Sequence, residues 1–273
     1  MKMVKKMKVV TLEQSKKIQL DILLAVHEFC LKSHLSYYLT FGTLIGAIRH
    51  NGFIPWDDDI DIFMPRGDYE KFISSFKADN YQCYSLEKDK KYPFPYAKVV
   101  DIRTIKEEPL HISKKIKMGI DIDVFPLSFY YEEDYKGKIV KKWNHNRRLS
   151  YQATSKFNNG GLLKSILLFP IRLVLRPFTR SIAFKISNLT NPQAKGREPI
   201  GYITGTTSCD DIFLYPFKWF EKPMTHLFEN HELFIPCGYD ELLKMIYGDY
   251  MTPPPPDKCV PIHGYPAYLK DEE

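Results

Sequence analysis

The spacing of apolar residues changes along the chain from helical periodicity to short continuous runs. Between Thr11 and about Leu35 apolar residues recur every three or four positions, which predicts an amphipathic helix with Thr11 as its N-cap. Residues 36–40, SYYLT, then predict a short buried strand. Helical spacing returns at residues 65–76 and 239–247. The sequence therefore predicts helices interleaved with strands.

Two further segments alternate acidic and apolar residues, the period of a strand with one open face. Residues 56–63, WDDDIDIF, predict a strand with Asp57, Asp59 and Asp61 on one face and Asp58, Ile60 and Ile62 on the other. Residues 118–125, MGIDIDVF, predict a second strand in which Asp121 and Asp123 share a face with each other.

The paired carboxylates of Asp59 and Asp61 predict a divalent-cation site. Like charges held close together repel unless a proton or a cation neutralises them, and Mg²⁺ prefers carboxylate and phosphate oxygens as ligands. One more carboxylate from a neighbouring strand would complete a three-acid site. The alternative is a solvated acidic turn, but such turns carry glycine or asparagine more often than interleaved isoleucines.

A glycine-threonine corner precedes the first acidic strand. The chain passes through Phe41-Gly42-Thr43 into a predicted helix from Leu44 to Arg49. Gly42 permits a close backbone approach, and Thr43 is predicted to cap the helix with its hydroxyl pointing outward. Free N–H groups at a helix start bind phosphate. Taken alone, the corner equally fits an ordinary helix cap, but beside the aspartates it indicates an enzyme that handles nucleotides.

The middle of the chain has a different character. Its segment KGKIVKKWNHNRR, within residues 130–157, predicts an exposed basic helix. Residues 162–183 then mix leucine, isoleucine, valine and phenylalanine with four basic residues, Lys164, Arg172, Arg176 and Arg180, and two prolines interrupt them. Charges and prolines argue against a spanning helix. The segment instead predicts an interfacial helix with snorkelling arginines, and the alternative is a helix packed in a second lobe.

Composition narrows the classes of function. The chain of 273 residues has a formal charge of +6, too small to predict nucleic acid as a partner. The five cysteines are scattered without a CxxC pair, so neither a zinc module nor a disulfide framework is expected. The first residues carry no long apolar run, and a cytoplasmic location is expected. His231 and His263 have no visible partner in the sequence and receive no role.

The segment FGTLIGAIRHNGFIPWDDDIDI resembles the LicD family, which includes fukutin and fukutin-related protein. The resemblance extends to Lys98 within AKVVDIRT, to IDVFPL, and to YDELLKMIYGDYMTPPP. It implies an α+β fold with a nucleotidyltransferase-like mixed sheet flanked by helices and an additional, mainly helical region. We expect a catalytic core at 1–128, a helical insertion that contacts membrane or acceptor at 129–200, and a C-terminal part that packs back on the core at 201–273.

The resemblance also implies a reaction. Members of the LicD family transfer a phospho-alcohol from a CDP-activated donor to a sugar hydroxyl of a cell-surface glycan. For this chain, the implied glycan is a teichoic acid, lipopolysaccharide or capsular polysaccharide. The implied cofactor is Mg²⁺ or Mn²⁺, and the implied catalytic ligands are Asp59, Asp61 and Asp123, with Asp121 as an alternative third acid. Phosphate contacts are expected from Gly42, Thr43, Arg49 and Lys98.

The expected partners are the CDP-alcohol and a glycan acceptor that can be lipid-linked, with peripheral contact between residues 162–183 and the inner face of the cell membrane. Choline, glycerol, ribitol and ethanolamine all fit the sequence as the carried alcohol. Two other functions are consistent with the same residues. One is a nucleotidyltransferase that releases pyrophosphate, and the other is a non-catalytic scaffold at the membrane surface.

Overall fold

The computed structural model describes residues 7–107, 116–131, 138–154, 162–189, 199, 201–204, 214–261 and 263–270. Its α-helices are α1 (Leu12–Ser33), α2 (Phe41–His50), α3 (Arg66–Ser75), α4 (Lys138–Thr154), α5 (Leu162–Leu175), α6 (Thr179–Leu189) and α7 (Tyr239–Tyr247). Its strands are β1 (Lys8–Val9), β2 (Tyr38–Leu39), β3 (Asp61–Pro65), β4 (Tyr81–Tyr84), β5 (Ala97–Asp101), β6 (Thr104–Lys106), β7 (Asp121–Tyr130), β8 (Gly201–Ile203), β9 (Leu214–Tyr215), β10 (Met224–Phe228), β11 (His231–Ile235) and β12 (Ala267–Leu269). Short 3-10 turns lie at Arg176–Phe178, Phe217–Trp219 and Pro256–Lys258.

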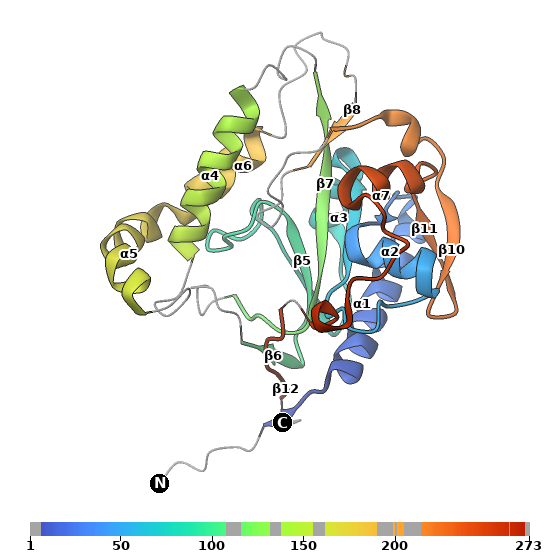
Figure 1. Cartoon of the computed structure of the whole chain (residues 1–273), viewed down its shortest axis with the longest axis horizontal. Helices are drawn as coiled ribbons and strands as arrows, with labels where there is room; N and C mark the ends of the chain where they lie inside the picture. Colours follow the sequence, from blue (N-terminus) through green and yellow to red (C-terminus); the bar gives the residue numbers. More distant parts are fainter. Residues whose placement is uncertain are drawn as a thin grey trace.

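The main sheet is mixed, and it has the order β2-β3-β7-β5-β4 with β8 and β9 continuing from β7. Only the β3–β7 pair is parallel, while the neighbouring pairs are antiparallel. The long strand β7 runs through the middle of the molecule, with α1, α2 and α3 beside it (Figure 1). This is the α+β class with a mixed sheet flanked by helices that the sequence predicted.

Helix α1 begins where its N-cap was predicted. Thr11 accepts the N–H of Gln14 at 3.2 Å, and the Gln14 side chain accepts the N–H of Thr11 at 3.0 Å. This reciprocal capping box contributes about 1 kcal/mol to the helix. The apolar stripe of α1, which includes Ile22, Leu23 and Val26, is fully buried in the main core. The predicted amphipathic helix is therefore confirmed.

The first acidic strand starts later than predicted. Pairing begins at Asp61, whereas residues 56–60 form a turn and an extended segment. Side chains of α1 hold several carbonyl oxygens ahead of β3. Lys16 donates to Ile54 O and Pro55 O at 2.9 Å, and Gln19 donates to Asp58 O at 3.0 Å. Within residues 56–60, the Asp58 carbonyl is thus bound by a side chain of α1, where a longer strand would need it for pairing.

The chain turns between β5 and β6. It leaves β5 at Asp101 and turns at Ile102 and Arg103 before β6 begins. The Asp101 carboxylate accepts the backbone N–H of Arg103 at 2.9 Å and pairs with the guanidinium of the same residue at 2.6 Å. An aspartate that bonds its own backbone two residues on favours a turn over a continuous strand.

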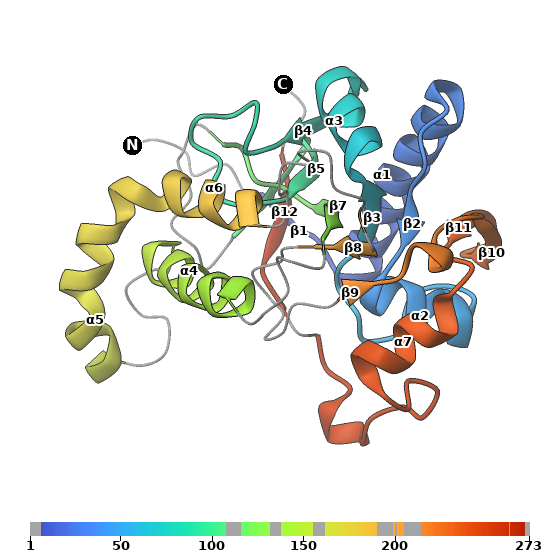
Figure 2. The same cartoon turned by 90° about the horizontal axis from the view of Figure 1, so that it is seen from above.

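Helices α4, α5 and α6 form a separate group to one side of the sheet (Figures 1 and 2). They share a small core made of Trp143, Ala153, Ile182 and Ile186, whereas the large core takes in residues from α1 through Tyr250. The predicted basic helix is confirmed as α4, although its Trp143 is fully buried. None of the described helices is long and apolar enough to cross a bilayer.

The arginines of this group do not snorkel outward as the sequence suggested. Arg172 is only 1% exposed and donates to Oε1 of Gln152 at 3.3 Å. The guanidinium of Arg180 lies 4.5 Å from the ring centre of Phe184 and donates to Leu86 O at 3.1 Å. Both arginines therefore join helices to their neighbours, and the exposed side chains of α5 are mainly apolar.

Candidate active site

Helix α2 presents its first turn to a cavity of about 580 Å³. The helix begins at Phe41, and its first internal hydrogen bond runs from Leu44 N to Thr40 O at 3.0 Å. The N–H groups of Phe41, Gly42 and Thr43 precede that bond, and such groups carry the positive end of the helix dipole. The sequence predicted the helix start at Leu44, three residues later. The earlier start places Gly42 inside the first turn of the helix, where free N–H groups can bind an anion.

Gly42 is required by its contact with an aspartate. A Cβ at this position would lie 2.6 Å from Oδ2 of Asp57, closer than any carbon can stand to an oxygen without moving it. The absence of a side chain lets the Asp57 carboxylate approach the helix start across the floor of the cavity. Binding of a phosphate at Gly42 stays a prediction.

Thr43 has a different role from the predicted helix cap. It is the third residue of α2 and is 3% exposed, and its hydroxyl accepts the N–H of Asp61 at 2.9 Å. The N-cap is Thr40, whose side chain makes no capping bond. Thr43 therefore fixes the start of β3 against the first turn of α2.

The three predicted acids of the first motif face the same space. Asp57, Asp59 and Asp61 all line the cavity, and Ile60 and Ile62 are fully buried behind them. The alternation predicted from the sequence is thus confirmed, even though only the last aspartate lies in a strand. The buried isoleucines anchor the segment, and this leaves the carboxylates on the open side.

Asp123 is placed beside Asp61 by strand pairing. In the parallel pair β3–β7, Asp61 lies opposite Asp123, and the N–H of Asp123 donates to Ile60 O at 2.8 Å. Across the other edge of β7, Asp123 lies opposite Lys98 of β5. The two predicted acidic strands are therefore neighbours in the sheet, with Asp61 opposite Asp123. Asp61, Asp123 and Lys98 form a row of charged side chains across β3, β7 and β5.

The carboxylates of this cluster have strongly shifted pKa values. Burial, followed by the nearby charge of Asp59, raises the pKa of Asp57 to about 8. Burial and the charges of Asp59 and Asp123 raise the pKa of Asp61 well above its usual value. Burial also raises the pKa of Asp123 to about 6, against the lowering effect of Lys98. A divalent cation would relieve this repulsion, so the oxygen-rich cluster fits Mg²⁺ or Mn²⁺.

Asp121 differs from Asp123 because lysines hold both of its oxygens. Lys98 donates to Oδ2, and Lys106 donates to Oδ1 at 2.9 Å. Burial alone would raise the pKa of Asp121, but Lys106 and Lys98 lower it to about 2. Lys98 also donates to Oδ1 of Asp123 at 2.5 Å. This arrangement favours Asp123 as the third acid and makes Asp121 the counter-ion that orients the two lysines.

Arg49 connects α2 to the C-terminal part of the chain. It lines the cavity and donates to Tyr250 O at 2.6 Å and to Nε2 of His50 at 3.0 Å. The predicted tail motif contributes further lining residues, among them Tyr247 and Asp249. The first and last family-like motifs therefore both line one cavity. Contact of Arg49 or Lys98 with a phosphate stays a prediction.

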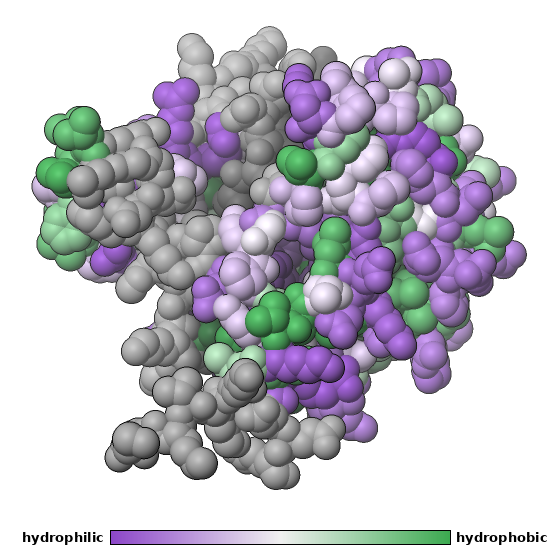
Figure 3. Space-filling view, turned by 60° about the horizontal axis from the view of Figure 1, so that its bottom comes forward, coloured by the Kyte–Doolittle hydropathy of each residue, from purple (hydrophilic) through white to green (hydrophobic). Residues whose placement is uncertain are grey.

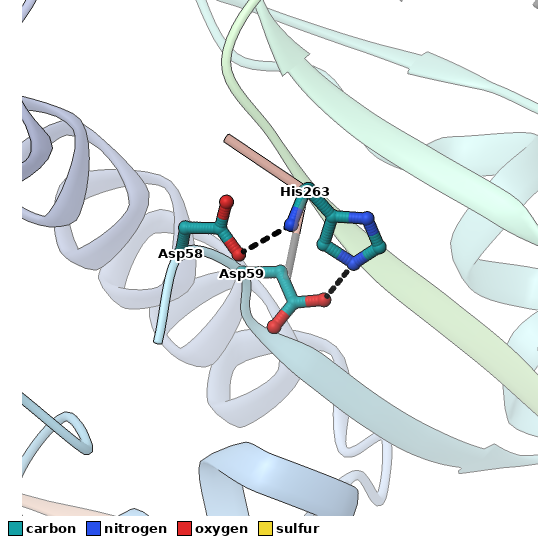
Figure 4. Close-up of side chains that lie close together, drawn as sticks. All are labelled: Asp58, Asp59 and His263. Atoms are coloured by element: carbon teal, nitrogen blue, oxygen red, sulfur yellow. Dashed lines mark hydrogen bonds and ion pairs between the residues drawn. The ribbon is translucent and has the colours of Figure 1, made fainter. Parts of the chain in front are cut away.

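His263 is the site residue that the sequence did not identify. Its Nε2 lies 2.9 Å from Oδ2 of Asp59, more than 200 residues earlier in the chain, and it lines the cavity (Figure 4). Burial would raise the pKa of Asp59, but the hydrogen bond and charge of His263 lower it. In turn the hydrogen bond to Asp59 raises the pKa of His263. No local spacing signals such a pair.

The loop that carries His263 is fixed by Asp58 and by a small sheet. Asp58 accepts the N–H of His263 at 3.4 Å and of Gly264 at 2.6 Å. Strand β12 then pairs between β1 and β6. Asp58, Asp59 and His263 are close enough for their ligand atoms to share a metal ion. Because Asp58 already binds two backbone N–H groups, we assign it to loop anchoring and Asp59 to the cation.

Comparison with known proteins places this arrangement in a family. Residues 34–159 match the sequence model described as "LicD/FKTN/FKRP, nucleotidyltransferase domain". The chain is 30% identical over 275 residues to "Lipopolysaccharide cholinephosphotransferase LicD" of Haemophilus influenzae, covering 96% of this chain and 100% of that protein. The chain belongs to the LicD family. An uncharacterised protein of Rickettsia prowazekii is 28% identical over 182 residues, which cover 64% of this chain and 66% of that protein.

The family match includes both acidic segments of the site. The matched range contains α2, β3, β5 and β7, and hence Gly42, Asp59, Asp61, Lys98 and Asp123. His263 lies outside that range. The LicD assignment predicted from the motifs is therefore confirmed, while the roles of the individual residues stay predictions.

Proposed function

We propose that this LicD-family protein is a metal-dependent phosphotransferase that moves phosphocholine from CDP-choline to a sugar hydroxyl of a cell-surface glycan. The observation that carries the proposal is the meeting of a helix start with Asp59 and Asp61 at one cavity, with Asp123 of β7 opposite Asp61 in the sheet. The Haemophilus relative, named as a lipopolysaccharide cholinephosphotransferase, supports phosphocholine as the group and lipopolysaccharide as the class of acceptor.

The chain's own residues divide the work of binding and proton transfer. The N–H groups of Gly42 and Thr43 would bind a phosphate of the donor, and Arg49 lines the same cavity as Gly42. Asp59, Asp61 and Asp123 would hold Mg²⁺, which when bound neutralises the diphosphate and draws charge from the reacting phosphorus. These assignments rest on the positions of the side chains. Gly42, Arg49, Asp59 and Asp61 line the cavity, and Asp123 lies opposite Asp61 on the neighbouring strand β7.

The transfer step itself breaks one bond and forms another. The sugar hydroxyl oxygen attacks the phosphorus of the phosphocholine group, the bond to the CMP oxygen breaks, and CMP leaves with the electron pair. Asp123 would accept the hydroxyl proton as general base. Lys98, which donates to the same carboxylate, fixes its orientation.

The walls of the cavity favour choline among the four alcohols. Phe41, Trp56, Tyr247 and Tyr250 supply aromatic rings, and Asp249 adds a carboxylate near them. Aromatic faces and a nearby negative charge recognise quaternary ammonium groups. Glycerol and ribitol lack that cation, and ethanolamine presents a smaller, strongly hydrated one.

The proposal is tested with purified protein, Mg²⁺, lipopolysaccharide and a panel of CDP-linked choline, ethanolamine, glycerol and ribitol. We expect CMP release with CDP-choline only when acceptor is present, together with phosphocholine on the glycan detected by mass spectrometry. EDTA should abolish both, and added Mg²⁺ or Mn²⁺ should restore them. Release of pyrophosphate from CTP, with nucleotide left on the acceptor, would instead establish the nucleotidyltransferase alternative. Turnover that survives EDTA would contradict the cation site.

Removal of His263 should weaken the cation site. His263→Ala deprives Asp59 of its hydrogen bond, so the Mg²⁺ concentration for half-maximal activity should rise about 10- to 100-fold, the usual cost of losing a group that orients a metal ligand. A Mg²⁺ titration of CMP release measures this shift. The control is His231→Ala, which removes an exposed histidine of β11. An unchanged titration midpoint in His263→Ala would rule out this positioning role.

A further inference from the structure

Helix α5 exposes an unusual number of large apolar side chains. Leu163 is 85% exposed and Leu167 is 77% exposed. They belong to a set that we call the α5 surface, whose members are all at least 42% exposed: Leu163, Ile166, Leu167, Phe169, Ile171, Leu173, Val174 and Phe178. Hydrophobic residues gather at the left end of Figure 3, where α5 lies in Figure 1. Surfaces of this kind mark a binding partner or a membrane.

The packing of α5 is the reverse of that in an ordinary surface helix. Its contact with α4 includes the buried Arg172, which donates to Gln152, while Leu163, Leu167 and Leu173 are exposed to solvent. Among the α5 leucines whose side chains the structure describes, Leu175 packs against the small core of α4 and α6. A helix that folds against water alone buries its leucines and exposes its arginines. The outward apolar face therefore indicates an apolar environment outside the protein.

The charge of this region identifies that environment. Between Tyr135 and Arg197 the sequence contains 14 Lys and Arg residues and no Asp or Glu. The whole chain has a formal charge of +6, so the rest of it carries −8. The helical group is thus a basic module attached to an acidic core, and exposed basic residues such as Lys142, Arg148 and Lys185 accompany the apolar α5 surface.

We propose that the α5 surface docks the protein on an anionic phospholipid bilayer. The apolar side chains enter the boundary between headgroups and acyl chains, while the surrounding basic residues bind lipid phosphates. A second copy of this chain fits less well because it would bring another basic module against the first. A nucleic acid would leave the leucines exposed to water. The inference is independent of the transfer reaction and involves none of its residues.

Binding to vesicles of defined composition tests this surface. We expect the full chain to float with vesicles of phosphatidylglycerol and phosphatidylethanolamine, and to bind neutral phosphatidylcholine vesicles at least about tenfold more weakly. Higher salt should weaken the anionic binding because it screens the charges. The double variant Leu163→Asp/Leu167→Asp should lose at least about tenfold in affinity. Its control is Leu31→Asp/Leu227→Asp, which changes two leucines of the core region that are 50% and 48% exposed.

A second pair of variants measures how much the basic residues contribute to vesicle binding. Arg148→Gln/Lys185→Gln should weaken binding to anionic vesicles about fivefold for each charge removed, whereas Lys32→Gln/Lys71→Gln, on exposed faces of α1 and α3, should not. Circular dichroism confirms folding of every variant. Equal binding by the leucine variant and its control would overturn the proposal. So would a stable dimer in solution that the leucine variant disrupts, or binding to single-stranded RNA without binding to vesicles.

Discussion

Replacing Asp61 by asparagine is expected to lower CMP release by about 10³-fold or more, since loss of an anionic cation ligand removes several kcal/mol of transition-state stabilisation. Asp61 stands between the other acids: Asp123 lies opposite it in the sheet, and Asp57 and Asp59 line the same cavity. Asparagine keeps the size of the side chain and the backbone bond to Thr43. The loss would therefore come from charge and not from misfolding.

The same substitution should stabilise the metal-free protein. The pKa of Asp61 is raised well above its usual value by burial and by its acidic neighbours, so the folded state binds a proton more tightly than the unfolded chain. Such a group costs stability as pH rises above about 4, its ordinary pKa range. In EDTA the free energy of unfolding of the natural protein should fall between pH 5 and pH 8, and Asp61→Asn should fall less. Urea unfolding at both pH values measures the difference.

Asp79→Asn is the matched control, because Asp79 is exposed and far from the cavity motif in sequence. It should leave both CMP release and unfolding unchanged. Mg²⁺ should stabilise the natural protein and this control but not Asp61→Asn, as expected for a ligand that binds only the folded state. Full turnover in Asp61→Asn would remove Asp61 from the site, and equal stabilisation by Mg²⁺ would locate the cation elsewhere.

Local patterns predicted those parts of the site that lie within one element or between neighbours in the sheet. The isoleucines interleaved in DDDIDI correctly predicted that the aspartates face the cavity. Side chains alternate in an extended backbone whether or not it is hydrogen-bonded as a strand. The predicted start of that strand was wrong: pairing begins at Asp61, and Gln19 of α1 takes the Asp58 carbonyl that a longer strand would use. Such competition between distant elements leaves no periodic signal.

Long-range contacts account for the features that the sequence did not predict. His263 reaches Asp59 only because β12 pairs with β1 and β6, all of them strands of two or three residues. Thr43 looked like a helix cap, but its hydroxyl is taken by Asp61 of the adjacent strand. The buried Arg172 was read as a snorkelling residue because its partner, Gln152, lies on another helix. In each case a single hydrogen bond across elements decides the role of the side chain.

Replacing Lys98 by methionine is expected to lower the free energy of unfolding by about 3 kcal/mol or more, the cost of leaving buried carboxylates without their cation. The Lys98 ammonium is 8% exposed and donates to both Asp121 and Asp123. Methionine preserves most of the volume but neither hydrogen bond. Lys106 continues to hold one oxygen of Asp121, so the Asp123 carboxylate loses more of its support. Urea unfolding at pH 7 measures the loss.

The pH dependence of this loss separates charge from packing. Asp121 has its pKa lowered to about 2, so in the natural protein its ion pairs add stability above about pH 4 that disappears as pH falls toward 2. Without Lys98 the carboxylates bind protons more tightly when folded, and the variant gains relative stability on acidification. The gap between natural protein and Lys98→Met should therefore narrow from pH 8 to pH 5. A constant gap would mean that methionine merely packs badly.

A double-mutant cycle tests the proposed partnership directly. If Asp121 is the counter-ion that Lys98 needs, Asp121→Asn should cost less in the Lys98→Met background than in the natural protein, with a coupling energy of about 1 to 3 kcal/mol. Lys71→Met, at a lysine whose side chain is 70% exposed, should change stability by less than about 0.5 kcal/mol. Additive effects of the two substitutions would show that the lysine acts on Asp123 alone, and that Asp121 is free to serve as a ligand.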